Sequence, residues 1–113
     1  MKVCEVRFSP EADRVYKQLR EEAAQFKIQR SLFEAINQKE TFILADSHYG
    51  NPMPKNLIPQ EYIEKYDVNN LFRIELPNFW RMFYTLINDP EPIAIIIDIL
   101  DHKQYNKKFG YKS

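Results

Sequence analysis

This sequence has few of the residues on which several common kinds of functional site depend. Its 113 residues include one cysteine, Cys4, and two histidines, His48 and His102. A single cysteine excludes a disulfide within the chain, and three such side chains do not supply the usual four ligands of a structural zinc site. Two glycines are too few for a glycine-rich phosphate loop. We therefore expect neither a bound metal nor a cofactor.

Long apolar runs and net charge are also missing. There is no apolar stretch of about 18 residues, and the chain starts with a strand-like segment that lacks the apolar centre of a signal peptide. These absences predict a cytoplasmic protein without a membrane partner. The 16 basic and 16 acidic residues cancel, which argues against coating nucleic acid by bulk charge. A local excess of positive charge remains, because residues 102–113 contain four lysines and no acidic residue.

The most informative stretch of the chain is residues 71–100, which has the composition of three successive strands. Two breaks divide it, at Pro77–Asn78 and at residues 88–92. Between the breaks the residues are β-branched, aromatic or apolar, as strands in a buried sheet prefer. The third run, Ile93–Ile99, is apolar on both faces except at Asp98, which predicts a central strand covered on both sides.

The length of the first hairpin loop decides where the charged side chains of this sheet point. A three-residue loop, residues 77–79, places Glu75 opposite Arg81, with Arg73 on the same face. A two-residue loop instead places Arg81 among the apolar side chains, because a shift of one residue reverses every side chain. Only the first register separates the charges, so we predict it. In that register Trp80 points into the core.

The N-terminal part predicts one strand and then helical cover for the sheet. Residues 2–8 alternate as a strand does, and Ser9–Pro10–Glu11 has the pattern of a helix start. Two apolar stripes at helical spacing follow. They consist of Ala12, Val15, Tyr16, Leu19 and Ala23, and of Ile28, Leu32, Ala35, Ile36 and Ile43. We interpret them as an antiparallel helical hairpin with its bend at residues 22–26; one continuous helix is the alternative.

A long connection, residues 46–70, joins the helices to the sheet. Loops of more than about 12–15 residues usually have a function or contain structure of their own. We predict an ordered surface loop at residues 48–57 and a short helix at residues 59–66 that packs Ile63 and Tyr66. The complete prediction is one α+β domain, residues 1–113, with a small and mostly antiparallel sheet backed by the helical hairpin.

The candidate functional residues lie on the hairpin face and just beyond the predicted central strand. Arg81 is placed on the open face of the sheet, and His102 and Tyr105 open a helix predicted for residues 102–109. Arginine neutralises phosphate charge, and histidine and tyrosine exchange protons with oxygen atoms, so these residue types suit phosphodiester chemistry. The lysines of the same region would add phosphate contacts: Lys103, Lys107 and Lys108.

Each of these residues also has a structural interpretation. Arg81 is equally placed to pair with Glu75 across the hairpin, and His102 to be a neighbour of a helix cap. The lysines would then form a solvated face. The aromatic residues of the tail would anchor it on the core: Tyr105, Phe109 and Tyr111.

The order of elements, together with the two segments Arg81–Tyr84 and His102–Tyr105, resembles the RelE/ParE toxin superfamily. Its members are small toxins of toxin–antitoxin pairs, so the resemblance implies a small, acidic cognate antitoxin as a partner. In the RelE-like branch it implies ribosome-associated mRNA cleavage by attack of a ribose 2′-hydroxyl on the adjacent phosphate. In the ParE-like branch it implies inhibition of DNA gyrase without catalysis. An inactive interaction module with this fold is a third possibility.

The resemblance also implies roles for individual residues. In an RNA-cleaving member, Arg81 would stabilise the phosphorane, and His102 and Tyr105 would transfer protons or orient a base. The remaining basic residues would hold the RNA backbone: Arg73, Lys103, Lys107 and Lys108.

Overall fold

The computed structural model describes residues 2–3, 5–88 and 90–110. Within these residues, five strands form one sheet in the order β1-β5-β4-β3-β2. The strands are β1 (Glu5–Phe8), β2 (Asn51–Pro52), β3 (Phe72–Glu75), β4 (Arg81–Asn88) and β5 (Pro92–Leu100). β1 pairs with β5 in parallel and every other pair is antiparallel. The predicted α+β class with a mostly antiparallel sheet is therefore confirmed.

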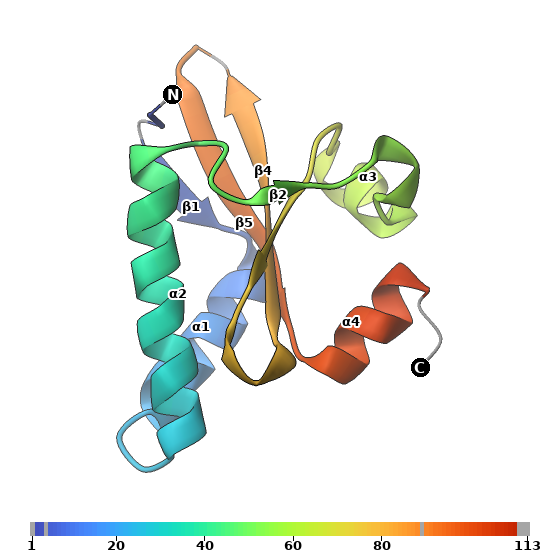
Figure 1. Cartoon of the computed structure of the whole chain (residues 1–113). Helices are drawn as coiled ribbons and strands as arrows, with labels where there is room; N and C mark the ends of the chain where they lie inside the picture. The colour runs from blue at the N-terminus through green and yellow to red at the C-terminus, as the bar shows by residue number, and fades with distance from the viewer. Residues whose placement is uncertain (1, 4, 89, 111–113) are drawn as a thin grey trace.

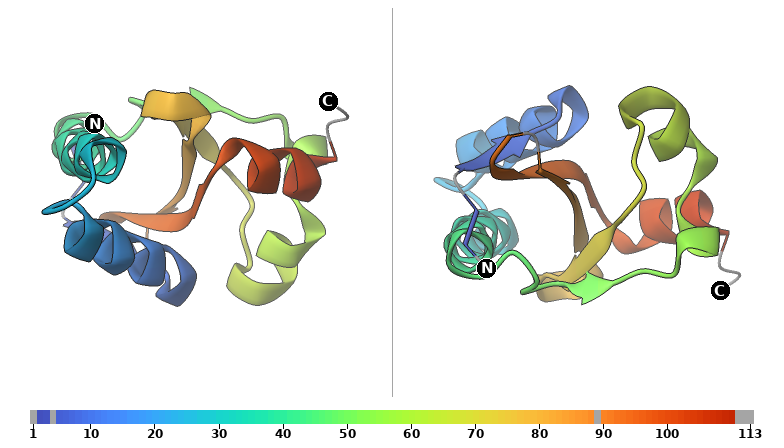
Figure 2. Two further views of the ribbon diagram at one scale, coloured as in Figure 1. Left: turned by 90° about the horizontal axis from the view of Figure 1, so that it is seen from below. Right: turned by 90° about the horizontal axis from the view of Figure 1, so that it is seen from above.

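Helices cover both faces of this sheet (Figure 1). They are α1 (Pro10–Glu22), α2 (Lys27–Ala45), α3 (Gln60–Tyr66) and α4 (His102–Phe109), with short 3₁₀ turns η1 (Lys55–Leu57) and η2 (Pro77–Phe79). α1 and α2 lie on one side of the sheet, and α3 and α4 lie on the other, as the views from below and above show (Figure 2). The first layer is the predicted helical hairpin, and the cover predicted for both sides of the central strand is also present. That α3 and α4 provide the second layer is an additional finding.

Each layer has its own apolar core. The first core lies between the sheet and the α1–α2 pair and includes Leu32, Ile36, Met82 and Tyr84, all with 0% exposure. The second lies between the sheet and the α3–α4 layer and is built around Phe83. Neighbouring residues on β4 therefore belong to different cores, as the alternation of side chains along a strand requires.

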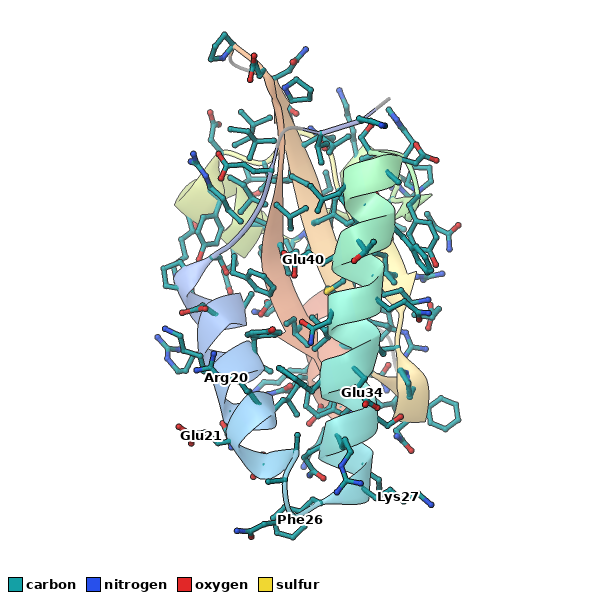
Figure 3. All side chains as sticks on the ribbon, turned by 90° about the vertical axis from the view of Figure 1, so that its left-hand side faces the viewer. Arg20, Glu21, Phe26, Lys27, Glu34 and Glu40 are labelled. Carbon is teal, nitrogen blue, oxygen red and sulfur yellow. The ribbon has the colours of Figure 1, made fainter. Side chains whose placement is uncertain are left out.

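The α1–α2 pair is a helical hairpin, as predicted, and not one continuous helix. Ser9 caps α1 by accepting a hydrogen bond of 3.0 Å from the Ala12 amide, with Pro10 in the first turn. Phe26 lies at the bend between the helices and is 51% exposed (Figure 3). Ile28, which we placed in the apolar stripe, is 53% exposed, because it lies in the first turn of α2, next to the bend.

The predicted register of the β3–β4 hairpin is also confirmed. Glu75 pairs with Arg81, and the Leu76 amide donates a hydrogen bond of 2.9 Å to the Trp80 carbonyl across the three-residue turn η2. The expectation that Trp80 is a core residue is only partly met. Trp80 packs against the first core but is half-buried, because it lies at the end of the sheet, where α1 and α2 cover it incompletely.

β5 is the central strand, as predicted, with β1 and β4 on either side. Its pairing with β4 is interrupted by a bulge, since Phe83 pairs with Asp98 and Tyr84 pairs with Ile96. The extra residue is Ile97, and both Ile97 and Asp98 contact the α3–α4 layer. The bulge therefore directs the Asp98 carboxylate toward the second core.

The long connection contains more structure than predicted. Residues 48–57, expected as a surface loop, include the edge strand β2. Tyr84 attaches this segment to the sheet, because its hydroxyl accepts a hydrogen bond of 2.9 Å from the Gly50 amide and donates one of 2.8 Å to the Ser47 carbonyl. Burial raises the pKa of Tyr84 to about 12, so the hydroxyl stays protonated and able to donate. A Cβ on Gly50 would come within 2.8 Å of the Tyr84 ring.

The short helix predicted for residues 59–66 is present as α3, but it buries a different residue. Tyr62 is 1% exposed, whereas Ile63 is 37% exposed. Tyr66 is half-buried. Tyr62 and Tyr66 are four residues apart and share one helix face, which leaves Ile63 outside it.

A polar contact joins α3 to the start of α1. Lys65 Nζ lies 2.6 Å from the Glu11 carboxylate, and the Tyr66 hydroxyl donates to the same group. The hydrogen bonds from Lys65 and then Tyr66 lower the pKa of Glu11 to about 2. Because the pKa is depressed in the folded state, this contribution to stability is complete above pH 4.5 and is lost as the pH falls through about 2.

We therefore expect Glu11→Gln to lower the free energy of unfolding by about 1 kcal/mol at pH 7. The deficit should shrink as the pH falls below 4.5 and vanish near pH 2. Thermal unfolding of both proteins across this pH range measures the effect. Glu21→Gln is the matched control, because Glu21 is exposed on the outer side of α1 (Figure 3) and should leave stability unchanged. If Glu11→Gln is still less stable than the parent at pH 2, the ionised Glu11 carboxylate is not the source of the lost stability.

Candidate functional site

The candidate site is built around two arginines on the sheet face that carries α3 and α4. Arg73 on β3 and Arg81 on β4 point to the same side, because Arg73 pairs with Phe83 and Arg81 pairs with Glu75. The Glu75 carboxylate lies between them, 3.0 Å from Arg73 Nε and 3.2 Å from Arg81 Nε. The predicted grouping of these three charged residues on one face is confirmed, and so is the Arg81–Glu75 pair. The face is less open than predicted, because α4 covers part of it and the Arg81 side chain is 16% exposed.

Tyr105 connects this arginine pair to α4. The Arg81 guanidinium carbon lies 4.6 Å from the centroid of the Tyr105 ring, within the range of a cation–π contact. Arg73 Nη1 donates a hydrogen bond of 3.2 Å to the Tyr105 hydroxyl. The ring is 6% exposed and stacks on Phe83, with centroids 5.8 Å apart. Tyr105 therefore anchors α4 on the sheet, as one of the two interpretations of the sequence predicted, and also orients both guanidinium groups.

The charge of this cluster is not balanced. Two guanidinium groups share one carboxylate, which leaves an excess of one positive charge among Arg73, Arg81 and Glu75. The Arg81 side chain is 16% exposed and Arg73 is 30% exposed, whereas Glu75 is 51% exposed. Each Nε atom is buried and makes no well-aligned hydrogen bond with a described group, despite its closeness to Glu75. A partly desolvated cationic pair of this kind attracts an anion with oxygen acceptors, such as phosphate.

His102 lies at the rim of the site, next to the η2 turn. It begins α4, where Asp101 accepts a hydrogen bond of 2.8 Å from the Gln104 amide and the Gln104 side chain bonds back to Asp101, forming a capping box. The imidazole is exposed and lies 3.2 Å from Asn106. Its centroid is 5.9 Å from that of Phe79, whose carbonyl accepts a hydrogen bond from Arg81 Nη1. Phe79 thus connects His102 to the arginine pair.

The three candidate lysines of α4 differ in their surroundings. Lys103 and Lys107 are exposed, as a role in holding an RNA backbone requires. Lys108 Nζ instead lies 2.8 Å from the Glu61 carboxylate and 3.1 Å from that of Asp98. Burial lowers the pKa of Lys108, but the hydrogen bonds and charges of the two carboxylates outweigh burial and raise the pKa overall. Lys108 therefore joins α4 to α3 and β5, and we leave it out of the phosphate site.

The buried carboxylate of Asp98 is the centre of this second polar group. Asp98 is 7% exposed and accepts a hydrogen bond of 2.7 Å from the Tyr62 hydroxyl. Burial, followed by the negative charge of Asp98, raises the pKa of Tyr62 well above its ordinary value. Our sequence analysis noticed Asp98 only as an interruption of an apolar strand. A lone acidic residue in such a strand signals a buried partner, which here comes from α3 and α4.

Further polar residues that no sequence pattern indicated lie at the β2–β3 edge of the sheet. An open cavity of about 270 Å³ is bordered there by Arg73 and Glu75, and by Lys39 of α2 and Tyr49 of the connection. Lys39 Nζ donates a hydrogen bond of 3.1 Å to the Tyr49 hydroxyl. Lys39 is 34 positions before Arg73 in the chain, and no local sequence pattern relates the two.

The described residues provide neither a cluster of metal ligands nor a helix suited to crossing a membrane. No group of three or more His, Cys, Asp or Glu side chains among them could hold a metal ion. None of the described helices combines the length and the apolarity that a membrane crossing requires. Tyr111, which we expected to anchor the tail, lies outside the described residues.

The fold and the site define a small α+β domain with a partly desolvated arginine pair and an exposed histidine at its rim. Comparison with protein-family models, with curated proteins and with solved structures found no significant match for this chain. The resemblance to the RelE/ParE toxins therefore stays a prediction that comes from the sequence.

Proposed function

We propose that this protein is a RelE-like toxin that cleaves ribosome-bound mRNA. One observation carries the proposal: Arg73 and Arg81 share a single carboxylate above Tyr105, and His102 lies at the rim of the same face. A cationic site for a phosphate and a side chain able to transfer a proton are what cleavage of an RNA phosphodiester needs.

In the proposed reaction, the ribose 2′-oxygen forms a bond to the adjacent phosphorus and the bond from phosphorus to the 5′-oxygen breaks. The 2′-hydroxyl proton passes to water, and His102 supplies the proton that the leaving 5′-oxygen gains, since an imidazole can exchange protons near neutral pH. The products are a 2′,3′-cyclic phosphate and a 5′-hydroxyl. Negative charge grows on the phosphoryl oxygens in the transition state, where Arg81 and Arg73 stabilise it.

Tyr105 has a different part in this proposal from the one that the resemblance implies. Its ring is buried and its hydroxyl already accepts a hydrogen bond from Arg73. We therefore assign Tyr105 to positioning the two guanidinium groups, and proton transfer to His102. Lys103 and Lys107, both exposed on α4, would contact the flanking phosphates.

The balanced charge of the chain fits a substrate that the ribosome presents. With 16 basic and 16 acidic residues, the protein releases few counterions when it binds RNA, so affinity for free RNA should be weak. The ribosome would then supply the affinity and this site the chemistry. A small, acidic antitoxin is the partner proposed for the same protein, and a neighbouring gene is where we would look for it.

The second candidate function is that of a ParE-like toxin that inhibits DNA gyrase, or of an inactive interaction module. The observation that favours it is the contact of Arg81 with Glu75. In a module without catalysis, this contact would stabilise the hairpin and do nothing else.

Expression of the protein in bacterial cells distinguishes these functions. We expect new 5′ ends in translated messages, mapped by primer extension, and 5′-hydroxyl termini that must be phosphorylated before they can be ligated. The same messages without translation should remain intact. If no new ends appear and DNA supercoiling by gyrase is inhibited instead, the proposed function is wrong and the ParE-like alternative is supported.

A further inference from the structure

Phe79 has a conformation and an exposure that the fold does not account for. Its φ is 64°, in the left-handed region that aromatic side chains rarely adopt. The preceding residue, Asn78, has a φ of 60°, which asparagine tolerates far better. The Phe79 side chain is 71% exposed, more than any other large hydrophobic side chain described. A strained aromatic residue with its ring in solvent points to a role in binding rather than in packing.

The polar contacts at the tip of the hairpin hold Phe79 in this position. The Trp80 amide donates a hydrogen bond of 3.3 Å to the Pro77 carbonyl, which closes the turn. Arg81 Nη1 donates to the Phe79 carbonyl. The arginine of the proposed phosphate site therefore also fixes the backbone that carries the exposed ring.

A second exposed ring lies beside the first. The centroids of Phe79 and His102 are 5.9 Å apart and their planes are inclined by 58°. Both side chains are exposed, so both rings are accessible to a flat ligand. The two come from different elements, η2 and α4, that meet at one end of the sheet.

The charge around these rings indicates the chemistry of that ligand. Arg81 lies on one side, paired with Glu75, and Lys103 follows His102 directly on α4. Asp101 precedes His102, but its carboxylate accepts the capping hydrogen bond from the Gln104 amide, and residues 102–110 include no acidic side chain. The exposed aliphatic side chains are on other elements: Ile28 and Leu44 on α2, Leu57 on η1, Ile63 on α3 and Ile87 on β4. An apolar peptide would therefore find one aromatic ring and cations, whereas a nucleotide would find a stacking surface beside a site for its phosphate.

We infer that Phe79 and His102 form a stacking platform for an unpaired nucleobase of single-stranded RNA, next to the phosphate held by Arg81. This inference rests on the proposed function and adds the base-binding part of the site. It accounts for the strained backbone of Phe79, because in this conformation the ring is exposed and a base can stack on it. His102 then contacts the base and delivers the proton.

The test uses an eight-nucleotide single-stranded RNA with 2′-O-methyl sugars, which cannot undergo 2′-hydroxyl attack. Its binding to the full chain is measured by fluorescence anisotropy at low salt. We expect Phe79→Ala and Phe79→Leu to weaken binding by roughly 5–150-fold, the range for losing one base–aromatic stack. Phe79→Trp should bind at least as tightly as the parent. Phe26→Ala is the matched control, because Phe26 is another exposed phenylalanine and lies at the α1–α2 bend; it should bind as the parent does.

Probes with one abasic nucleotide locate the stacked base. When the abasic nucleotide replaces the stacked base, the affinity of the parent should fall by the same factor as the Phe79→Ala substitution lowers it for the intact RNA. The parent and Phe79→Ala should bind that abasic probe equally. Phe79→Gly provides a second variant without the ring, in which glycine accepts the positive φ, so the result stands even if Phe79→Ala unfolds. His102→Phe should keep RNA affinity and lose cleavage, because it retains a ring and removes the proton donor.

Several results would overturn the platform. They are parental affinity in Phe79→Leu, no discrimination against any abasic probe, and no RNA binding by the parent at low salt. Another is unchanged RNA binding by Phe79→Ala together with weaker binding of the neighbouring gene product, which would make this surface a protein contact.

The proposed function fails separately: if Phe79 governs RNA binding but no message is cleaved, the platform stands without the nuclease. If messages are cleaved equally by parent and Phe79→Ala, the nuclease stands without the platform.

Discussion

Replacing Arg81 with alanine should lower the rate of ribosome-dependent mRNA cleavage by about 10²–10³-fold, the effect of removing one donor aimed at developing charge. The reason is the position of its guanidinium group, which is 16% exposed, supported by the Tyr105 ring and partly compensated by Glu75. Its orientation is already set before a substrate arrives, so little reorganisation is needed when charge develops on the phosphate. Single-turnover cleavage of a ribosome-bound message measures the change.

Glu75→Gln is the control that separates catalysis from the structural ion pair. It removes the negative charge of the same ion pair but leaves both guanidinium groups in place, so cleavage should stay close to the parental rate. Stability should fall by about 1 kcal/mol or less in Glu75→Gln, because Glu75 is half exposed. Arg81→Ala also loses the contact with the Tyr105 ring, so its free energy of unfolding should fall by about 1–2 kcal/mol. If Glu75→Gln lowers cleavage as much as Arg81→Ala does, then Arg81 matters because its ion pair stabilises the hairpin. The proposed stabilisation of the transition state by Arg81 would then be wrong.

Replacing Phe83 with alanine should lower the free energy of unfolding by about 3–5 kcal/mol, as for other fully buried phenylalanines. Phe83 has 0% exposure, and its ring stacks on Phe109 and Tyr105 with centroids 4.6 and 5.8 Å away. Truncation leaves a cavity between β4 and α4 that the flat rings on either side cannot fill. Thermal unfolding should show a loss of roughly 10–20 °C for a domain of this size.

Hydrogen exchange tests which helices lose stability in Phe83→Ala. The amides of α4 should lose far more protection than those of α2, because Tyr105 and Phe109 of α4 stack on Phe83, whereas α2 packs on the first core. Phe83→Leu, which keeps most of the volume, should cost less than about 1.5 kcal/mol. Uniform loss of protection in both helices would show that the two cores unfold as one unit and that α4 has no separate attachment.

These two predictions are linked through α4. The helix carries His102 at its first residue and Tyr105 one turn later, so its docking on Phe83 sets the position of the proposed proton donor relative to Arg81. Arg81→Ala removes the charge and its contacts with the Phe79 carbonyl and the Tyr105 ring but leaves both apolar cores intact. Phe83→Ala removes the packing that holds α4 and leaves the charge in place. Cleavage should fall in both variants, but only Phe83→Ala should also lower stability strongly.

Much of the fold follows from local patterns in the sequence. The charges of Arg73, Glu75 and Arg81 segregate in only one hairpin register, and the structure has that register. The apolar run of β5, the Ser9–Pro10 helix start and the capping residues of α4 are local signals too. Each of them depends on neighbours within a few positions, and such interactions can be read without knowing the rest of the chain.

What the sequence by itself determined about this protein is therefore the class of fold, the hairpin and the charged face of the sheet. Only the tertiary structure decided that a second layer, α3 and α4, covers that face, that Lys108 pairs with Asp98 and Glu61, and that Tyr105 lies under Arg81. The left-handed conformation of Phe79 also emerged there. The physical reason is that these contacts join residues up to 47 positions apart. Packing and burial in the folded chain decide which of these residues meet, and no periodic pattern along the sequence indicates such pairs.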